Sequence, residues 1–529
     1  MVADLNGDGV PEVVDTAGIH IYAWESDGKP VPGFPVASSR YFCRPQLESQ
    51  PLGHPKCGFL SSPAVGHLES PTGPLDIVAP SLDGHLYAFD AHGKPLPGFP
   101  VALVDPSVPK SQQMIAEAIN EPAIANLSGD GKQEVVVATN ETYGAVQDPA
   151  QGLSALLAGA AGGSSRVYAV WPSGNAHAGG PFLPGWPVKL DGAIQSTLPL
   201  IGPGQNPAIA KIGGQETIVA STTGSATIEE YDPGGAQVRA VQQGAYGPGS
   251  NATDRSGTIN LFESAVLGRL SPGSPLDIVK YGLSLSDVSN LLLTGQNAPY
   301  NHLIGAYDST TGAPLPSWPR ITDDFQFLSA SDIARVDTGS PGNQVVAGTG
   351  LGLLHAYDGT TGRDVSGFPK VTGGWLFAPA AFSNDGRMAD ITREGYLFQW
   401  NLPRLAKCQN QWPQFRHDPH QSGNYDADGT PPNKPRALSL KNGVLSWKAP
   451  GGDYWCGAAD RYRIVTSSQP ITPERFAAAT PLASPPEPKW GGTVQTYRLP
   501  AHKRYVAIRA IDNAGNVGYS AQVDTRPGV

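Results

Sequence analysis

Short apolar runs alternate with acidic, glycine-rich turns along most of the chain, and together they form a recurring sequence motif. In its first copy, an apolar run at Val2-Ala3 enters an Asp/Gly turn and Val13-Val14 leaves it. A third run, Ile21–Trp24, is followed by Gly33-Phe34-Pro35. Runs of this length bounded by Gly, Pro and Asp are typical of β-strands. The motif therefore predicts about four short strands in each repeat unit.

The motif recurs in about seven repeat units of roughly 48 to 85 residues. Later copies of the third run end at Phe89, Val170, Tyr231, Tyr307, Tyr357 and Trp400. Four strands per unit, repeated radially, are the signature of a β-propeller. A parallel β-solenoid is the alternative, but its coils are much shorter than these units. We expect an all-β fold in which residues 1–425 form an about seven-bladed β-propeller.

The pattern changes after a Pro-rich linker at residues 426–435. Residues 436–529 contain further short strands separated by turn signals, which suggests a β-sandwich with Trp447 in its core. Leu499-Pro500 shortly before Tyr505 resembles a tyrosine corner. This stretch resembles a fibronectin type III domain, and the resemblance implies a second domain of that fold.

The segment Trp412–Gly423 lies at the end of the propeller repeats. We expect Trp412–Phe415 to supply the outer strand of the last unit in place of Gly-Phe-Pro. The alternative is a catalytic or metal site formed by His417 and His420. Because Pro419 lies between them, a helical spacing that would put both rings on one face is disfavoured.

The turn of the first unit carries oxygen side chains at alternate positions, namely Asp4, Asn6, Asp8 and Glu12, and the carbonyl of Val10 can add a fifth ligand. Ca²⁺ prefers such a set of hard oxygen ligands in an irregular loop. The spacing resembles the start of an EF-hand loop, but strands flank it. The turn resembles the calcium loop of FG-GAP/VCBS repeats in integrin-like propellers. That resemblance implies Ca²⁺ as the cofactor of this turn.

A second copy of the turn has Asn126, Ser128, Asp130, Lys132 and Glu134 at the same positions. Its first carboxylate is replaced by an amide, and Ser stands at the third position of the loop in place of Asn. Because the number of charged ligands sets calcium affinity, this site should be weaker or empty. The turns of the other units keep the bend and lose the ligands.

Two further turns, 306–312 and 356–362, resemble the A-x-D-x-x-T-G turn of quinoprotein propellers, where it docks neighbouring blades. The sequence contains no distinct quinone site, and no catalytic triad or phosphate loop is signalled. Isolated acids such as Glu117, Glu121 and Asp287 could face a cleft. We therefore expect a non-enzymatic protein, with a polysaccharide lyase or a PQQ-dependent dehydrogenase as the alternative.

Composition limits the classes of binding partner and the cellular compartments that are compatible with this chain. The formal net charge is -10 and no Lys/Arg cluster is present, which argues against nucleic-acid binding, and no apolar run approaches the length of a membrane span. Four cysteines fit an exported protein, in which we expect a Cys43–Cys57 disulfide and a Cys408–Cys456 disulfide between the two domains. No signal peptide is visible, but the first unit lacks the Pro-Ala of the others. We expect a truncated N-terminus, with a genuine cytosolic start as the alternative.

These observations predict a secreted or cell-surface, calcium-stabilised propeller that binds or adheres to an extracellular glycan or protein. Long insertions at residues 140–165 and 282–302 fall between second and third strands. By the alternation of loops in an antiparallel blade, they should project from the face opposite the calcium turn. Long loops on a rigid scaffold are where binding usually resides, so we expect the ligand on that face.

Overall fold

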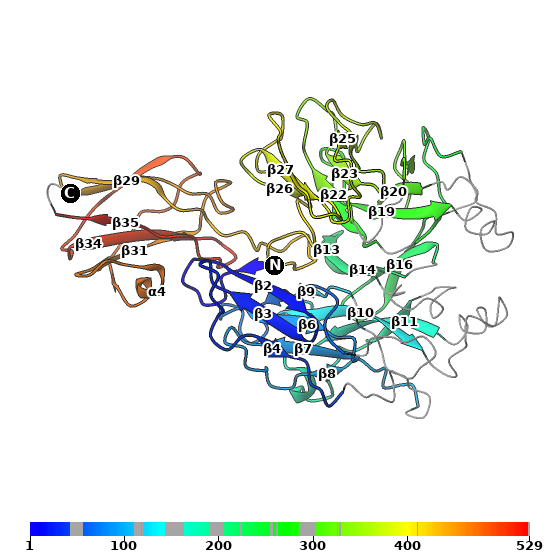
Figure 1. Ribbon diagram of the computed structural model, residues 1–529, viewed down its shortest axis with the longest axis horizontal. Coiled ribbons are helices and arrows are strands. Elements are labelled where there is room, and N and C mark those ends of the chain that lie inside the picture. Colours follow the sequence, from blue (N-terminus) through cyan, green and yellow to red (C-terminus); the bar gives the residue numbers. More distant parts are fainter. Residues whose placement is uncertain are drawn as a thin grey trace.

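The computed structural model describes residues 1–42, 57–109, 118, 120–142, 163–190, 205–222, 225–253, 258–260, 263–284, 302–324, 326, 330–409 and 411–526. These residues form nine antiparallel β-sheets and very little helix (Figure 1). Seven sheets, numbered here in chain order, belong to residues 2–401, and two belong to the C-terminal part.

Sheet one contains β1 (Val2–Ala3), β2 (Glu12–Ala17), β3 (His20–Trp24) and β4 (Val36–Ala37). Sheet two contains β5 (Ala64–Gly66), β6 (Asp76–Pro80), β7 (His85–Phe89) and β8 (Val101–Ala102). Sheet three contains β9 (Ala123–Ala125), β10 (Glu134–Thr142), β11 (Gly163–Val170) and β12 (Val188–Leu190), with the short 3-10 turn η2 (Gly174–Ala176) between its last two strands. Sheet four contains β13 (Ala208–Ile212), β14 (Gln215–Ser221), β15 (Thr227–Tyr231) and β16 (Gln237–Gln242).

Sheet five contains β17 (Thr258–Ile259) and β18 (Val266–Gly268), which both pair with β19 (Asp277–Ser284), then β20 (His302–Asp308) and β21 (Arg320–Ile321). Sheet six contains β22 (Asp332–Ala334), β23 (Gln344–Gly348), β24 (Leu353–Asp358) and β25 (Lys370–Val371). Sheet seven contains β26 (Ala381–Phe382), β27 (Arg387–Ile391) and β28 (Leu397–Asn401).

The innermost strands of these sheets lie side by side around one axis. β5 contacts β9, β9 contacts β13, β13 contacts β18, and β18 contacts β22. The apolar side chains of neighbouring sheets pack together between them, as where Ile333 of sheet six joins the core of sheets four and five. Sheets that follow one another around an axis and pack face to face form a β-propeller. The molecule therefore has the propeller fold that its repeats predict.

Residues 411–426, which we call the closing segment, run around this axis and connect the sheets to one another. One backbone N–H in each of six innermost strands donates to a carbonyl of the segment, at 2.8–3.1 Å. In order around the axis, the six pairs are Ile333 with Trp412, Phe382 with Pro413, Val2 with Pro419, Val65 with His420, Ile124 with Ser422 and Ile209 with Gly423. Sheet five joins the ring through Arg269, whose N–H donates to Oε1 of Gln411 (3.1 Å).

The order of these bonds shows how the ring of sheets closes. Along the closing segment, the partners come from sheets six, seven, one, two, three and four, so the segment makes one turn around the axis. The turn is completed where the Tyr425 hydroxyl donates to Gln411 Oε1 at 2.7 Å. The last sheet and the first are thus joined through consecutive parts of one segment.

The expectation that Trp412–Phe415 supplies an outer strand is wrong. Trp412 forms a β-bridge with Ile333 of β22, and Pro413 accepts from Phe382 of β26, so the segment lies along innermost strands. Sheet seven has three strands among the described residues, and β28 is its outermost. The inner position is favoured because it gives the backbone N–H groups of Ile333 and Phe382 an acceptor, as the rest of the closing segment does for four other strands.

Glycines of the Gly-Phe-Pro and Gly-Trp-Pro motifs hold neighbouring sheets close together. Gly33, Gly98 and Gly185 have φ angles of 100°, 85° and 84°, and a Cβ on each would overlap a carbonyl oxygen in the third turn of the next sheet. A left-handed φ and this backbone approach both require glycine. Trp318 docks similarly, with its indole N–H donating to Gly359 O of sheet six (2.8 Å).

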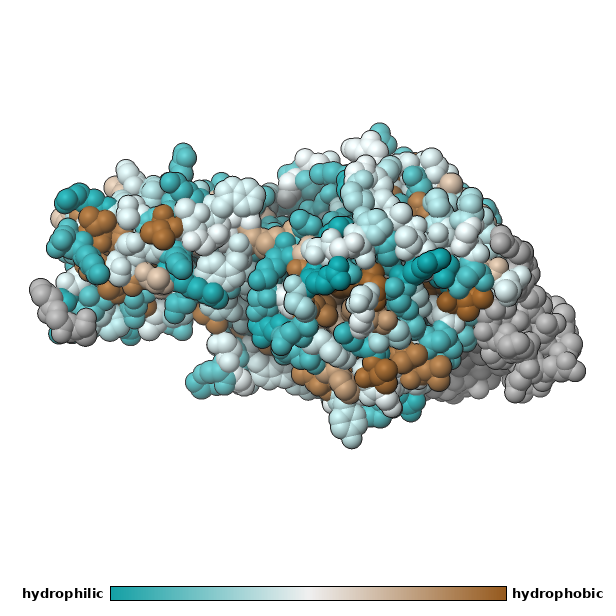
Figure 2. Space-filling model, turned by 90° about the horizontal axis from the view of Figure 1, so that it is seen from above, coloured by the Kyte–Doolittle hydropathy of each residue, from teal (hydrophilic) through white to brown (hydrophobic). Residues whose placement is uncertain are grey.

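The C-terminal part is a two-sheet sandwich attached at one side of the propeller (Figure 1). One sheet contains β29 (Arg436–Lys441), β30 (Val444–Lys448) and β33 (Val494–Arg498); the other contains β32 (Thr480–Pro481), β31 (Arg461–Ser467), β34 (Tyr505–Ile511) and β35 (Ala521–Asp524). A single helical turn, α4 (Pro473–Phe476), packs on the second sheet through Phe476. Trp447 is buried between the sheets, edge-on to Tyr462 at 5.3 Å. The face of both lobes seen in Figure 2 is largely hydrophilic, with a few hydrophobic patches.

Replacing Trp412 by alanine tests the closing segment. Trp412 is 2% exposed and packs in the core shared by sheets four to six. Truncating a buried Trp typically costs about 3–5 kcal/mol, so we expect Trp412→Ala to lower the free energy of unfolding of the propeller by about that amount in urea titrations. Trp490→Ala, at a 72% exposed site, should change it by less than about 0.5 kcal/mol. Equal denaturation midpoints for the two variants would contradict the inner placement.

Candidate functional site

The turn between β1 and β2 is built from hydrogen bonds of its own acidic side chains. Asp4 Oδ1 accepts from the N–H groups of Gly7 (2.9 Å) and Asp8 (3.1 Å), while Oδ2 accepts from Gly9 (2.8 Å). Asn6 Oδ1 accepts from Asp8 N–H (2.9 Å), and Asp8 Oδ1 accepts from Val10 N–H (2.7 Å). Such local side-chain bonds stabilise a tight turn and hold its oxygen atoms together.

Several negative charges meet in this turn without a basic side chain among its own residues. Burial, opposed by the backbone N–H groups, raises the pKa of Asp4 to about 6. Burial also raises the pKa of Glu12, and the Asp4 charge adds to the effect. The donor set is three carboxylates, the Asn6 amide oxygen and the Val10 carbonyl, all oxygen, which fits Ca²⁺.

Glu12 has a second role that recurs in other sheets. Glu12 is the first residue of β2, and its Oε2 accepts a hydrogen bond from Leu5 N–H at 2.7 Å. The first residue of the strand that follows the innermost one makes the same bond in four other sheets: Asp76 with Leu68 (3.0 Å), Glu134 with Leu127 (2.7 Å), Asp277 with Leu270 (2.8 Å) and Gln344 with Asp337 (3.0 Å). Because Gln344 does this without a charge, the position serves the scaffold in turns that lack the ligand set. This role was not predicted, although in each case the Asp, Glu or Gln acceptor lies seven or eight residues after its donor in the sequence.

The second candidate loop has the same shape with fewer charges. Asn126 Oδ1 accepts from Gly129 N–H (2.9 Å), and Asp130 Oδ1 accepts from Lys132 N–H (2.8 Å). Glu134 lies at the base of the loop, where its Oε2 accepts from Ser128 N–H at 3.2 Å as well. The loop therefore offers two carboxylates where the first offers three, which keeps it the weaker candidate.

The C-terminal sandwich packs directly on the first loop. Arg509 Nη1, from β34, donates to the carbonyls of Asp8 (3.1 Å) and Gly7 (3.4 Å). A Cβ on Gly9 would lie 2.7 Å from the Gly518 carbonyl oxygen. The turn that carries the candidate calcium ligands is thus part of the contact between the two domains. Nothing local in the sequence indicated this contact, because the partners are about 500 positions apart.

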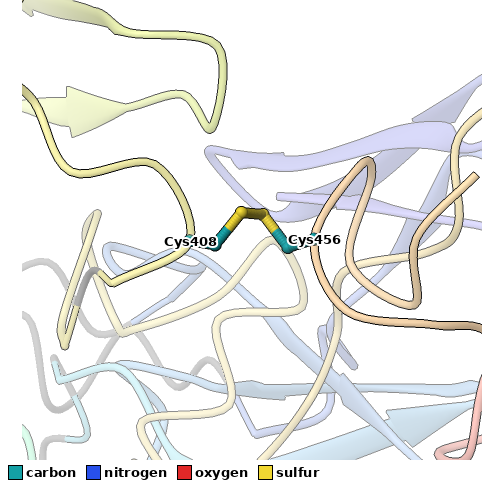
Figure 3. The surroundings of a disulfide bond; sticks show 2 residues. All are labelled: Cys408 and Cys456. Atoms are coloured by element: carbon teal, nitrogen blue, oxygen red, sulfur yellow. A yellow bond between two sulfur atoms is a disulfide. The ribbon is translucent and has the colours of Figure 1, made fainter. Parts of the chain in front are cut away.

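A disulfide also joins the two domains, as the sequence predicted. Cys408 follows the last propeller sheet and Cys456 lies in a turn of the sandwich, with an S–S distance of 1.98 Å (Figure 3). The expected Cys43–Cys57 pair involves Cys43, which lies outside the described residues. The described bond prevents the sandwich from moving freely on its linker.

A cleft of about 670 Å³, here called the junction cleft, lies between sheet seven and the sandwich. Its lining includes Arg387, Lys407, Gln414, Arg436, Tyr454 and Trp455. Two smaller cavities, of about 350 Å³ and 260 Å³, lie along the same boundary, and the smaller is lined in part by Asp4 and Asn6. The cavities described here therefore gather on the side of the calcium turn. The insertions 140–165 and 282–302 lie mostly outside the described residues, so their role as a ligand face stays a prediction.

Three carboxylates from distant positions converge at this boundary. Oxygen atoms of Asp428, Asp453 and Asp512 lie within 4.8 Å of one another. Burial, followed by the Asp428 charge, raises the pKa of Asp512 to about 6. Asn516 Nδ2 donates both to Asp512 Oδ2 (2.9 Å) and to the Asp428 carbonyl (2.8 Å). These bonds tie the linker to the last turn of the sandwich.

Among the described residues, His417 and His420 belong to no group of three potential metal ligands. His417 Nδ1 lies 3.6 Å from Asp418 Oδ2, and the group of three potential ligands found there is the Asp428 cluster instead. Glu121 is buried beside Arg416, whose charge counteracts the effect of burial on its pKa. Glu117 and Asp287 lie outside the described residues.

No family model matches the chain, and neither does any curated protein. Solved structures similar to it include the Dos1 propeller, with 12% identity over 76% of this chain and 78% of that chain and a TM-score of 0.42. BamB from Moraxella catarrhalis has 13% identity over 76% and 82%, with a TM-score of 0.37. The quinohemoprotein alcohol dehydrogenase ADHIIG from Pseudomonas putida has 14% identity over 82% and 76%, with a TM-score of 0.35. Likeness at this level concerns the fold and transfers no activity. Among the described residues, no helix is long and apolar enough to span a membrane.

Substitution of Glu134 separates the scaffold role from a metal role at this position. We expect Glu134→Gln to change the free energy of unfolding by less than about 1 kcal/mol, since an amide oxygen can accept from Leu127 as Gln344 does from Asp337. Glu134→Ala leaves buried N–H groups unpaired and should cost about 1–3 kcal/mol. Urea denaturation measures both. A Gln variant as unstable as the Ala variant would show that the charge itself is needed.

Proposed function

We propose that this protein is a binding module for an extracellular glycan or protein and that the junction cleft is its ligand site. The observation that carries the proposal is the cleft itself, a concave space of about 670 Å³ with aromatic, charged and amide side chains in its walls. Ligand sites are typically concave, combine a few placed polar groups with aromatic surface, and often lie between domains.

The cleft is suited to binding because its two walls are held in place. The Cys408–Cys456 disulfide joins them on one side, and the Arg509 contacts with the first loop join the same two domains elsewhere. A preformed site spends less binding energy on ordering its own groups than a mobile one. The disulfide also supports an exported, secreted or cell-surface protein, because such bonds persist in oxidising compartments.

We further propose that Ca²⁺ stabilises the contact between the domains. Asp4, Asn6, Asp8, Glu12 and the Val10 carbonyl would hold the ion, which supplies positive charge to a turn of crowded carboxylates. The turn also carries the carbonyls that accept from Arg509. Fixing the turn therefore supports the docked position of the sandwich.

Removal of calcium provides a direct test. For protein shown to start calcium-loaded, EDTA should lower the melting temperature by on the order of 5 °C, because an ion that binds the folded state stabilises it by mass action. Asp8→Ala should abolish this sensitivity, whereas Asp27→Ala, outside the loop, should retain it. A calcium-loaded protein whose melting is unchanged by EDTA would refute a stabilising role.

Binding through the cleft is tested with glycan and protein arrays probed with the intact chain. We expect Trp455→Ala to weaken binding of the array ligands at least tenfold while Trp490→Ala, an exposed residue outside the cleft lining, leaves it unchanged. Melting temperatures of both variants check that the fold is intact. Loss of binding confined to variants that shorten residues 140–165 or 282–302 would place the site on the opposite face.

A further inference from the structure

The junction cleft carries more positive than negative side chains. Arg387 comes from β27, Lys407 from the turn after β28, and Arg436 from β29. The carboxylate in the lining is Asp385, and Arg387 already binds it, with Nε 3.0 Å from Oδ1 and Nη2 2.5 Å from Oδ2. Neither Lys407 nor Arg436 forms an ion pair with another described residue. Within its lining, the cleft therefore offers two positive charges that no described carboxylate pairs with, and the Asp428 cluster lies beyond that lining.

This local excess contrasts with the rest of the molecule. The chain as a whole has a formal net charge of -10 and no Lys/Arg cluster in its sequence. The cationic side chains meet because two domains are brought together there. A concave site with one sign of charge concentrates ligands of the opposite sign, even on a protein whose overall charge would repel them.

An aromatic wall lies beside these charges. The Arg436 guanidinium lies 4.1 Å from the centroid of the Trp455 ring, which holds the cation against the wall by a cation–π contact. Tyr454, next to it, is 39% exposed. A flat indole or phenol surface can stack against the face of a sugar ring, and the side chains of Gln414 and Asn384 can bond its hydroxyls.

The disulfide fixes the separation of these elements. Lys407 is the residue before Cys408 on the propeller wall, and Trp455 is the residue before Cys456 on the sandwich wall. The bond thus sets how far the propeller's cation lies from the aromatic and Arg436 opposite. Reduction of this bond would remove one of the constraints on that separation.

We infer that the ligand of the junction cleft is an anionic polysaccharide, with carboxylate or sulfate groups bound by Lys407 and Arg436 and a sugar ring stacked on Trp455. This inference rests on the proposed function and adds the chemical class of its ligand. An acidic peptide would meet the same charges, but the half-buried Trp455, the exposed Tyr454 and the side-chain amides of the lining favour a polyhydroxylated ring.

Matched polymers test the class of ligand. The intact protein is titrated at fixed calcium with dextran sulfate, carboxymethyl dextran, neutral dextran and polyglutamate. We expect one or both anionic dextrans to bind at least tenfold more tightly than neutral dextran, and to lose affinity as salt is raised. Equal binding of neutral dextran would refute the charge requirement while leaving the proposed binding function standing. Polyglutamate binding as tight as that of the anionic dextrans would assign the cleft to an acidic peptide instead.

Charge reversal locates the binding. Lys407→Glu and Arg436→Glu should each weaken binding of the anionic dextran at least tenfold, whereas Lys441→Glu, exposed at the other end of β29, should change it less than twofold. Equal losses in all three variants would mean that the polymer is attracted to the protein surface in general, and would overturn the inference.

The double variant Cys408→Ser, Cys456→Ser tests the disulfide. It should also weaken binding, under conditions where circular dichroism and melting show both domains folded. Unchanged affinity there would refute the role of the disulfide. If Trp455→Ala leaves the affinity for every array ligand unchanged, the proposed function itself is refuted.

Discussion

The propeller depends on one set of backbone hydrogen bonds, in which six innermost strands each donate an N–H to the closing segment. These groups lie near the axis, away from the ladders of their own sheets, and buried N–H groups without acceptors are costly. A single segment satisfies them in order around the axis. To follow the ring it turns sharply, and Arg416, His417 and Gln421 adopt positive φ angles of 57°, 79° and 55°. Such angles are unfavourable for residues with a Cβ and persist where surrounding bonds impose them.

The same segment determines where the second domain begins. Its last residues bond to sheet four, where Asp426 Oδ2 accepts from Lys211 N–H at 2.6 Å, and the linker leaves from that point. Asp428 and its partners then hold the linker against the last turn of the sandwich. With the disulfide and Arg509, these contacts fix the sandwich over the first loop and sheet seven. The junction cleft is the space that remains between surfaces placed in this way.

The repeats predicted the sheets because each strand and turn is encoded locally, by apolar runs and by glycines such as Gly33 that the next sheet requires. The pairing of Cys408 with Cys456 was predicted too, and it is confirmed. The segment Trp412–Phe415 was misplaced because its partners are nonlocal, and no local pattern distinguishes an inner from an outer position. For the same reason the sequence did not reveal the contact of Arg509 with the candidate calcium turn. The calcium ligands and the fibronectin type III family of the sandwich stay predictions.

The position of the closing segment in the chain has a consequence for the order of assembly. All seven propeller sheets are synthesised before residue 411, yet the acceptors for their axial N–H groups follow it. While the chain emerges from the ribosome, each finished sheet therefore lacks a bond that becomes available only after all seven sheets have been made. The early sheets must wait in a partly open array, and the final step joins the first sheet to the last. Such a delay leaves the ring open until every sheet of the propeller has been made.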